Sequence, residues 1–208
     1  MKSKIIIHLG LHRTGTTFLQ KEVFERLTRV NYMFNDSLHT IQIKEGINLI
    51  SNEGLSQSMP HSKFDRIQIL DNIKKLFPNA KIILGIRYRE DWLKSCYYRY
   101  VLSGGKLKYQ KYIEHYSKNI IDNYTYLCEV RKRFSDVYTY TFEELKLMPK
   151  ETIKDICKFI EVEVPEYQNI KRNASLSGRQ LEMLRKINHT NLRHIVIPFI
   201  KWLQRTPT

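Results

Sequence analysis

The chain has 208 residues, and 42% of them are hydrophobic, which excludes a disordered chain and favours one domain with a buried core. The formal net charge is +14, a balance that favours anionic partners such as phosphates, nucleic acid, acidic glycans or a membrane surface. No apolar run reaches the length of a signal-peptide core or a transmembrane helix. The cysteines Cys96, Cys128 and Cys157 form no CxxC pair, so we expect a soluble, cytoplasmic protein with reduced thiols.

Apolar patterning predicts strands that alternate with helices. Short β-branched runs indicate strands, and apolar residues at helical spacing indicate helices. In chain order we predict a strand over 4–9, a helix over 16–29, a strand over 48–51, a helix over 63–77, a strand over 81–86, helices over 90–102 and 109–134, a strand over 137–141 and a helix that begins at Pro149. This order is typical of an α/β protein with a P-loop-like, three-layer fold, in which helices flank a central, mostly parallel sheet. We expect a single domain over 1–208, with its core over 4–160.

The segment GLHRTGTT (10–17) lies between the first predicted strand and the first predicted helix. A glycine-bounded loop in that place binds phosphate, because the first N–H groups of a helix lack partners and the helix dipole is positive there. Gly15 allows the backbone to approach a phosphate closely, and Arg13 adds a cation. Thr16 and Thr17 add hydroxyl donors, but Thr16 stands where an ATP-binding loop has lysine, which disfavours an ordinary ATPase or kinase. The alternative is an ordinary strand-to-helix turn with a threonine N-cap.

The predicted strand over 81–86 is followed by Arg87 rather than by an aspartate. Magnesium-dependent nucleotide enzymes usually carry an aspartate at such a strand end. The arginine, at the edge where α/β sheets bind ligands, indicates a second phosphate and no required metal. Ser95 follows eight residues later in the next predicted helix, where it can reach the same anion. The alternative for Arg87 is an ordinary ion pair with Glu90 or Asp91.

Three stretches together resemble the sulfotransferase family that uses 3′-phosphoadenosine-5′-phosphosulfate, in its bacterial, carbohydrate-sulfotransferase-like form. They are RTGTT (13–17), KIILGIRYREDWLKSCYYRY (81–100) and VYTYTFEEL (137–145). The resemblance implies that the 5′-phosphosulfate is held by Arg13, Thr14, Gly15, Thr16 and Thr17. Arg13 is then also a catalytic residue that neutralises the bridging oxygen, while Arg87 and Ser95 hold the 3′-phosphate. Sulfuryl transfer of this kind depends on positioning and charge stabilisation, requires no metal and leaves adenosine 3′,5′-bisphosphate as the product.

An acceptor hydroxyl needs a base to take its proton. The segment NLISNEGLS (48–56) resembles a strand of glycan-modifying members that ends in a catalytic glutamate, which makes Glu53 the first candidate; a solvated turn glutamate is the alternative. Small-molecule members use a histidine instead, and His39 or His61 would fill that role. We expect His12, inside the loop, to point to solvent. His8, inside the first strand, is expected to be a core residue whose hydrogen bonds are satisfied.

The segment KRNASLSGRQ (171–180) resembles the late family segment that closes over the 3′-phosphate. Its candidates are Lys171, Arg172, Asn173, Ser175 and Arg179. We select Arg172 and Asn173 as cofactor-binding residues. A solvated basic loop is the alternative.

The C-terminal part is strongly basic. From Lys171 to Thr208 there are eight Lys and Arg residues against the single acid Glu182. Apolar residues alternate with these charges over 190–208, so the tail is expected either to bind a membrane surface or a partner, or to dock on the core of the domain. Tyr97 and Tyr98 are candidates to line an acceptor groove, because aromatic faces stack on sugars.

Three functions remain open at this point. The first is an enzyme that moves a sulfuryl group to a hydroxyl, or an amine, of a carbohydrate or a glycolipid, in the cytoplasm or at the inner face of the membrane. The second is a P-loop kinase with an altered phosphate loop. The third, a basic nucleic-acid-binding protein, is disfavoured because the basic residues form no recognisable RNA or DNA module.

Overall fold

The structure is a computed structural model that describes residues 3–34, 38, 41–56, 65–116, 123–168 and 177–203. Its residues group into two compact units. The first unit contains residues 1–89 and 121–168, and the second contains 90–120 and 169–208. Each unit is therefore assembled from two separate stretches of chain. The expectation of one domain over 1–208 stays a prediction.

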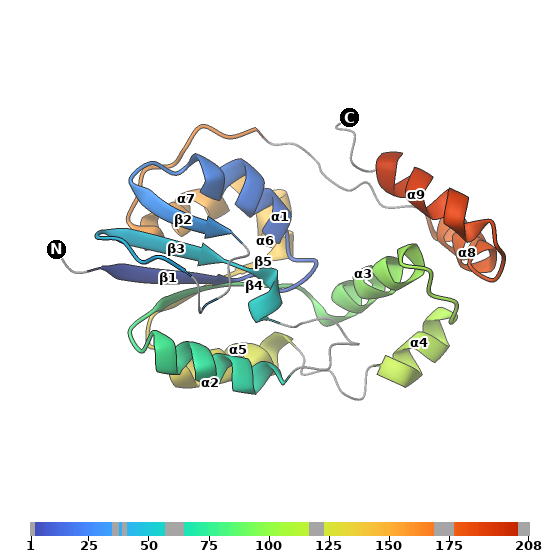
Figure 1. Cartoon of the computed structure of the whole chain (residues 1–208), viewed down its shortest axis with the longest axis horizontal. Coiled ribbons are helices and arrows are strands. Elements are labelled where there is room, and N and C mark those ends of the chain that lie inside the picture. Colours follow the sequence, from blue (N-terminus) through green and yellow to red (C-terminus); the bar gives the residue numbers. More distant parts are fainter. Residues whose placement is uncertain are drawn as a thin grey trace. The chain divides into compact units, whose positions relative to one another are not determined.

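The first unit is built on a sheet of five parallel strands (Figure 1). The strands are β1 (Lys4–Leu9), β2 (Val30–Phe34), β3 (Ile47–Ser51), β4 (Lys81–Ile86) and β5 (Val137–Thr141). They lie in the order β2-β3-β1-β4-β5, with β1 at the centre. After β1 the chain forms β2 and β3 on one side of β1, and then β4 and β5 on the other side. Parallel α/β sheets bind ligands where the strand order reverses in this way, beyond the carboxyl ends of the strands.

Helices cover both faces of this sheet, so the predicted three-layer α/β fold is confirmed (Figure 1). On one face, Ile7, Ile50 and Ile82 pack with side chains of α2 (Arg66–Leu76) and α5 (Asn123–Arg133). On the other face, neighbouring strand residues such as Ile6 and Ile83 pack with α7 (Pro149–Ile160) and with the helical segment after β1. Successive strand residues point to opposite faces, which is why continuous apolar strands sit between two layers.

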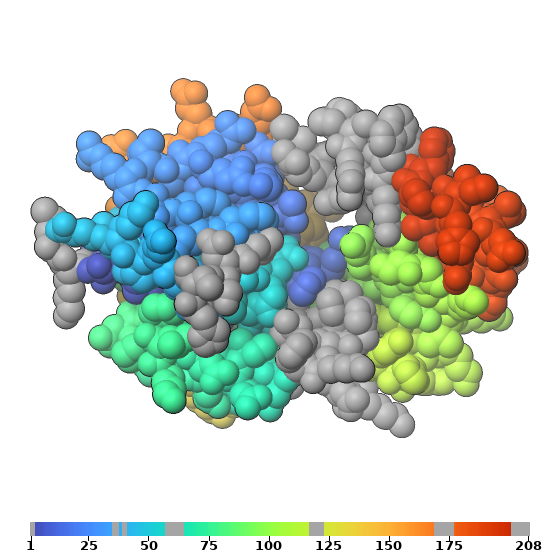
Figure 2. Space-filling view, in the orientation of Figure 1, coloured from blue at the N-terminus to red at the C-terminus, as the bar shows by residue number. Residues whose placement is uncertain are grey.

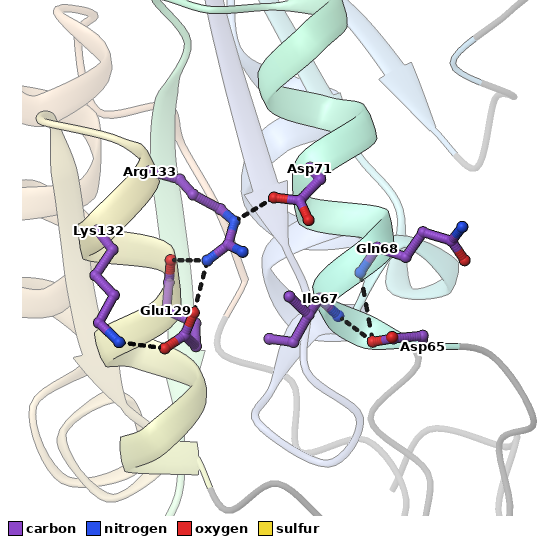
Figure 3. Close-up of polar contacts among 7 residues, drawn as sticks. All are labelled: Asp65, Ile67, Gln68, Asp71, Glu129, Lys132 and Arg133. Atoms are coloured by element: carbon purple, nitrogen blue, oxygen red, sulfur yellow. Dashed lines mark hydrogen bonds and ion pairs between the residues drawn. The ribbon is translucent and has the colours of Figure 1, made fainter.

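Polar contacts at the surface join the two helices on the first face (Figure 3). Arg133 on α5 donates from Nε to Asp71 Oδ1 on α2 at 2.7 Å and from Nη1 to Glu129 Oε2 at 2.7 Å. Asp65 begins α2 by accepting from the backbone N–H of Ile67 at 2.8 Å. These bonds fix the α2–α5 pair against the sheet, while the buried apolar side chains supply most of the stability.

Four of the predicted helices differ from the observed ones. The helix predicted over 16–29 ends at Arg26 and changes type along its length: α1 (Thr16–Phe18), a π-helical turn (Leu19–Val23) and a 3-10 turn (Phe24–Arg26). The helix predicted over 109–134 is replaced by α4 (Tyr109–Tyr116) in the second unit and α5 in the first. The helices predicted over 63–77 and 90–102 are Arg66–Leu76 and α3 (Arg89–Leu102). The strand β2 and the helices α6 (Phe142–Leu147) and α8 (Gly178–Ile187) were not predicted.

The second unit is helical and consists of α3, α4, α8 and α9 (Arg193–Leu203). It contains a group of tyrosines with ring contacts, in which Tyr97 and Tyr112 have ring centroids 5.3 Å apart. Tyr97 and Tyr98 are buried, and the groove-lining role considered for them stays a prediction. Asn188, at the end of α8, donates to the carbonyl oxygens of Val101 and Gly105, both at 2.8 Å.

Candidate functional site

The loop between β1 and α1 follows the carboxyl end of the central strand. Gly15 has a φ of +84°, and a side chain there would meet Leu145 Cδ2 at 2.6 Å. Arg13 adopts a φ of +71° without being a glycine, a conformation that costs energy and recurs at binding sites. A Cβ at Gly10 would meet Thr16 Cγ2 at 2.4 Å. The loop is therefore tightly closed: close contacts favour glycine at both Gly10 and Gly15, and the backbone angle also favours it at Gly15.

Two of the predicted hydroxyl donors are used inside the loop itself. Thr14 donates from Oγ1 to the carbonyl oxygen of Leu11 at 2.7 Å, and Thr16 donates to the same oxygen at 3.2 Å. Both side chains are buried, whereas Thr17 is exposed. Both hydroxyl protons are used within the loop in this structure, so ligand binding by the hydroxyls of Thr14 and Thr16 stays a prediction. What the loop can present is the set of backbone N–H groups at the start of the helical segment, together with the Thr17 hydroxyl.

A chain of buried polar side chains lies beneath this loop. Gln20 Nε2 donates to Ser51 Oγ at 2.9 Å, Ser51 Oγ lies 2.8 Å from His8 Nδ1, and His8 Nε2 lies 3.4 Å from Tyr140 Oη. The tautomer of His8 decides which group donates in its contacts with Ser51 and Tyr140. Tyr140 in turn hydrogen-bonds with Thr14.

This arrangement confirms His8 as a core residue with satisfied hydrogen bonds. Burial lowers the pKa of His8 to about 3, so the imidazole stays neutral near neutral pH. Burial is also the main cause that raises the pKa of Tyr140. Gly85 on β4 leaves the space for this contact, because a Cβ there would lie 2.4 Å from Tyr140 Oη and 2.9 Å from Thr14 Oγ1. The chain of polar groups thus ends at the loop and supports it from below.

Arg87 lies directly beyond the carboxyl end of β4 and contacts the loop. Its Nη1 donates to the carbonyl oxygen of Arg13 at 3.2 Å. Its guanidinium carbon lies 4.3 Å from the centroid of the Phe142 ring, and its Nε lies 3.8 Å from Glu143 Oε1. Asn123 Nδ2 donates to the Arg87 carbonyl at 3.0 Å. These groups fix a cation beside the loop, and its binding of a phosphate stays a prediction.

Glu53 lies beyond the carboxyl end of β3, in the short helical turn Glu53–Leu55. Its Oε2 lies 3.8 Å from His12 Nε2, and both side chains are about one-third exposed, at 31% and 28%. Ser56 Oγ donates to the carbonyl oxygen of Gly10 at 3.0 Å, which ties this turn to the loop. The structure therefore brings Glu53 close to the loop. His12 was expected to point to solvent, and the structure places its partly exposed ring beside the Glu53 carboxylate.

The remaining predicted site residues lie elsewhere. Ser95 is on α3 and Arg179 on α8, both in the second unit, so their convergence with Arg87 on one anion stays a prediction. Outside the described residues are Lys171, Arg172, Asn173 and Ser175, and the alternative bases His39 and His61. Across the described ranges, no three His, Cys, Asp or Glu side chains form a group that could hold a metal ion. A hollow of about 530 Å³, lined by 3–5 and 76–81, lies at the amino ends of β1 and β4 and contains none of the candidates.

Reasoning from the sequence missed three residues of this site: Tyr140, Phe142 and Glu143. The available signal was the segment TFEE (141–144), which has the T-x-x-E pattern of a capping box. In the structure the Thr141 side chain accepts from the backbone of Glu144 at 3.0 Å, and Glu144 Oε2 accepts from the backbone of Thr141 at 2.7 Å. That cap fixes the turn after β5, and because Ile86 pairs with Thr141, this turn lies beside Arg87.

Comparison with known proteins gives an independent view of the chain. Residues 52–166, more than half of the chain, match a family described as the sulfotransferase family; this range includes Glu53, Arg87 and Ser95, and the loop 10–17 precedes it. A crystal structure of a sulfotransferase from Alicyclobacillus acidocaldarius aligns with a TM-score of 0.56 at 14% identity, over 94% of this chain and 96% of that one. Mouse sulfotransferase SULT7A1 complexed with PAP aligns with a TM-score of 0.53 at 14% identity, over 90% and 64% of the two chains. No curated protein sequence matches this chain.

Proposed function

Because the chain belongs to the sulfotransferase family, we propose that it transfers a sulfuryl group from 3′-phosphoadenosine-5′-phosphosulfate to a hydroxyl or an amine of a carbohydrate or a glycolipid. The observation that carries the choice of co-substrate is the 3.2 Å hydrogen bond from Arg87 Nη1 to the Arg13 carbonyl. It joins a strand-end cation to the loop 10–17, which gives two anion-binding elements at one edge of the sheet. The mouse enzyme of similar fold was solved with PAP (adenosine 3′,5′-bisphosphate), a ligand with two phosphate groups.

The residues present fit such a co-substrate. The bound molecule supplies the sulfuryl group, and the bisphosphate that remains carries additional negative charge. Backbone N–H groups from Thr14 to Thr17 hold the 5′ end, because the first N–H groups of a helix lack partners within it. Arg13 stabilises the charge that develops on the bridging oxygen. Arg87 holds the 3′-phosphate, and we propose Ser95, Arg172 and Asn173 as its further contacts.

Glu53 is the proposed base that takes the proton of the acceptor. Its carboxylate is partly exposed, lies beyond the carboxyl end of β3 and is tied to the loop through Ser56. His12 Nε2, at 3.8 Å from Glu53 Oε2, orients that carboxylate. A carbohydrate or glycolipid acceptor is supported by the resemblance of 48–56 to glycan-modifying members and by the net charge of +14.

Thermal unfolding with four ligands tests the proposal: adenosine 3′,5′-bisphosphate, adenosine 5′-monophosphate, ATP with magnesium, and an oligonucleotide. We expect the bisphosphate to raise Tm most, since it fills both anion-binding elements. Arg87→Ala is expected to weaken binding of the bisphosphate about tenfold or more, by loss of a charge-assisted contact, and to leave binding of the monophosphate unchanged. Arg89→Ala, an exposed arginine two residues later, is the matched control.

Each other outcome has a defined meaning. Stabilisation by ATP with magnesium alone supports the kinase alternative, and stabilisation by the oligonucleotide alone supports nucleic-acid binding; either result contradicts the proposed co-substrate. If Arg87→Ala weakens binding of the monophosphate as much as binding of the bisphosphate, Arg87 does not hold the 3′-phosphate. Sulfation of glycan and glycolipid acceptors with labelled co-substrate then identifies the acceptor class.

A further inference from the structure

The helix α9 exposes a row of large apolar side chains. Leu192, just before the helix, is 57% exposed, Ile195 is 71% exposed and Phe199 is 58% exposed. Residues at spacings of three and four share one face of a helix, so these three form a continuous apolar row. Val196, Ile197 and Ile200 on the same helix are half-buried. The helix therefore carries an exposed apolar row, which marks an interaction surface.

The segment that carries this row is basic. Over 177–203, shown in red in Figures 1 and 2, there are five Lys and Arg residues and one acid, Glu182. Glu182 is paired with Arg185, whose Nη2 lies 2.6 Å from Glu182 Oε1. Lys186 is exposed on α8, and Arg193 lies between Leu192 and Ile195 in the sequence. This charge favours an anionic partner and opposes a second copy of the same surface, because a symmetric contact would bring like charges together.

We propose that α9 binds the surface of an anionic lipid bilayer. Leu192, Ile195 and Phe199 enter the boundary between headgroups and acyl chains, and the basic side chains remain at the lipid phosphates, as in interfacial amphipathic helices. Among the described residues no helix is long and apolar enough to cross a membrane. Eleven residues also span only about 16 Å, roughly half of the hydrocarbon thickness. The helix lies on the bilayer and does not enter it end-on.

The proline within the helix agrees with an interfacial position. Pro198 has no N–H, so the carbonyl oxygen of His194 loses its helical partner. Both residues are exposed, and water at the headgroup level can hydrogen-bond that carbonyl. In the hydrocarbon interior the same carbonyl would be left unsatisfied at high cost. The backbone of α9 is therefore suited to a wet surface with an apolar side.

Flotation of the full chain with lipid vesicles tests the proposal. We expect binding to vesicles of phosphatidylcholine with 30% phosphatidylglycerol, weak binding to pure phosphatidylcholine, and loss of binding in high salt, because the basic residues contribute through screened charge. Ile195→Glu should weaken binding to the anionic vesicles about tenfold or more, since one large apolar side chain no longer enters the boundary. Leu147→Glu, at an exposed leucine (78%) on α6 in the first unit, should bind as the unmodified chain does.

Circular dichroism and thermal unfolding of both variants establish that they are folded, and Arg193→Glu gives a second measurement through charge alone. Absence of binding to the anionic vesicles, or equal binding by Ile195→Glu and the unmodified chain, overturns the proposal. So does a dimer in gel filtration that Ile195→Glu converts to monomers, because the row would then be an interface between copies. None of these outcomes depends on the co-substrate or on sulfuryl transfer.

Discussion

At the scale of single residues, three glycines and two arginines define the proposed co-substrate site. Gly10, Gly15 and Gly85 each face a side chain that a Cβ would strike within 3 Å. The carbonyl of Arg13 accepts the hydrogen bond from Arg87. The glycines allow the loop to pack closely against its own threonines. The two arginines supply the positive charge that lysine supplies in an ATP-binding loop, where this chain has Thr16.

Glu53→Gln separates proton transfer from binding. Removing a general base costs typically 10²–10⁴-fold in rate, so we expect a loss of that size in turnover with near-normal affinity for adenosine 3′,5′-bisphosphate. Initial rates with labelled co-substrate and calorimetric binding measure the two effects. Glu163→Gln, at an exposed residue far along the chain, is the control. Retained turnover in Glu53→Gln would move the base elsewhere, with His61 as the next candidate.

His8 makes the stability of the protein depend on pH. Its native pKa of about 3 lies below the unfolded value of 6.5, so the unfolded chain binds an extra proton between these values. The free energy of unfolding therefore decreases as pH falls from 6.5 toward 3, by at most about 1.4 kcal/mol per pH unit for this group, and its contribution is complete above 6.5. Urea unfolding between pH 7 and pH 5 measures the slope.

The variant His8→Asn should show a shallower pH slope than the unmodified chain, whatever its absolute stability. His189→Asn, at an exposed histidine in the second unit, should keep the original slope. Equal slopes for His8→Asn and the unmodified chain would show that His8 is not held neutral in the folded state.

At the scale of elements, turns after strands place the side chains of the site. The loop after β1, the turn after β3 and the turn after β5 carry the candidate groups, and α6 begins in the last of these. The capping box of Thr141 and Glu144 fixes α6, and through Phe142 and Glu143 it supports Arg87. We therefore expect this helix cap to affect ligand binding as well as stability.

Thr141→Ala should cost about 1 kcal/mol of unfolding free energy, as loss of an N-cap usually does, and should also weaken binding of adenosine 3′,5′-bisphosphate. Asp65→Ala removes the cap of α2, where Asp65 accepts from Ile67 and Gln68. It should cost a similar amount of stability and leave ligand affinity unchanged. Urea unfolding measures the stability of the two variants, and calorimetry measures their affinity for the bisphosphate. Equal affinities of Thr141→Ala and Asp65→Ala would mean that the cap of α6 does not support Arg87.

At the scale of the whole molecule, the two compact units share one interleaved chain. The sequence predicts a single domain, so differential scanning calorimetry should show one unfolding transition. Adenosine 3′,5′-bisphosphate at 100 times its Kd should stabilise that transition by about 2.7 kcal/mol. Two transitions, of which the ligand shifts one, would disprove the single domain and leave the proposed ligand unaffected.

The fold could be predicted to a large extent because its signals are local. The predicted strands over 4–9, 81–86 and 137–141 match β1, β4 and β5 residue for residue. Short runs rich in apolar residues are typical of strands in a parallel sheet that helices cover on both faces. The prediction of one helix over 109–134 was wrong. The apolar residues keep helical spacing in both α4 and α5, although the chain passes from the second unit to the first between these two helices. Periodicity carries no information about such a passage.

The sequence by itself determined the type of site: a closed glycine loop after a buried strand, a cation in place of a magnesium-binding aspartate, and a basic, apolar C-terminal segment. The tertiary structure alone decided which groups meet. Arg87 reaches Arg13 across 74 positions of chain, and His8 lies beside Tyr140 across 132. These contacts follow from the strand order β2-β3-β1-β4-β5. Strand order is a property of long-range pairing, which no local pattern of residues specifies.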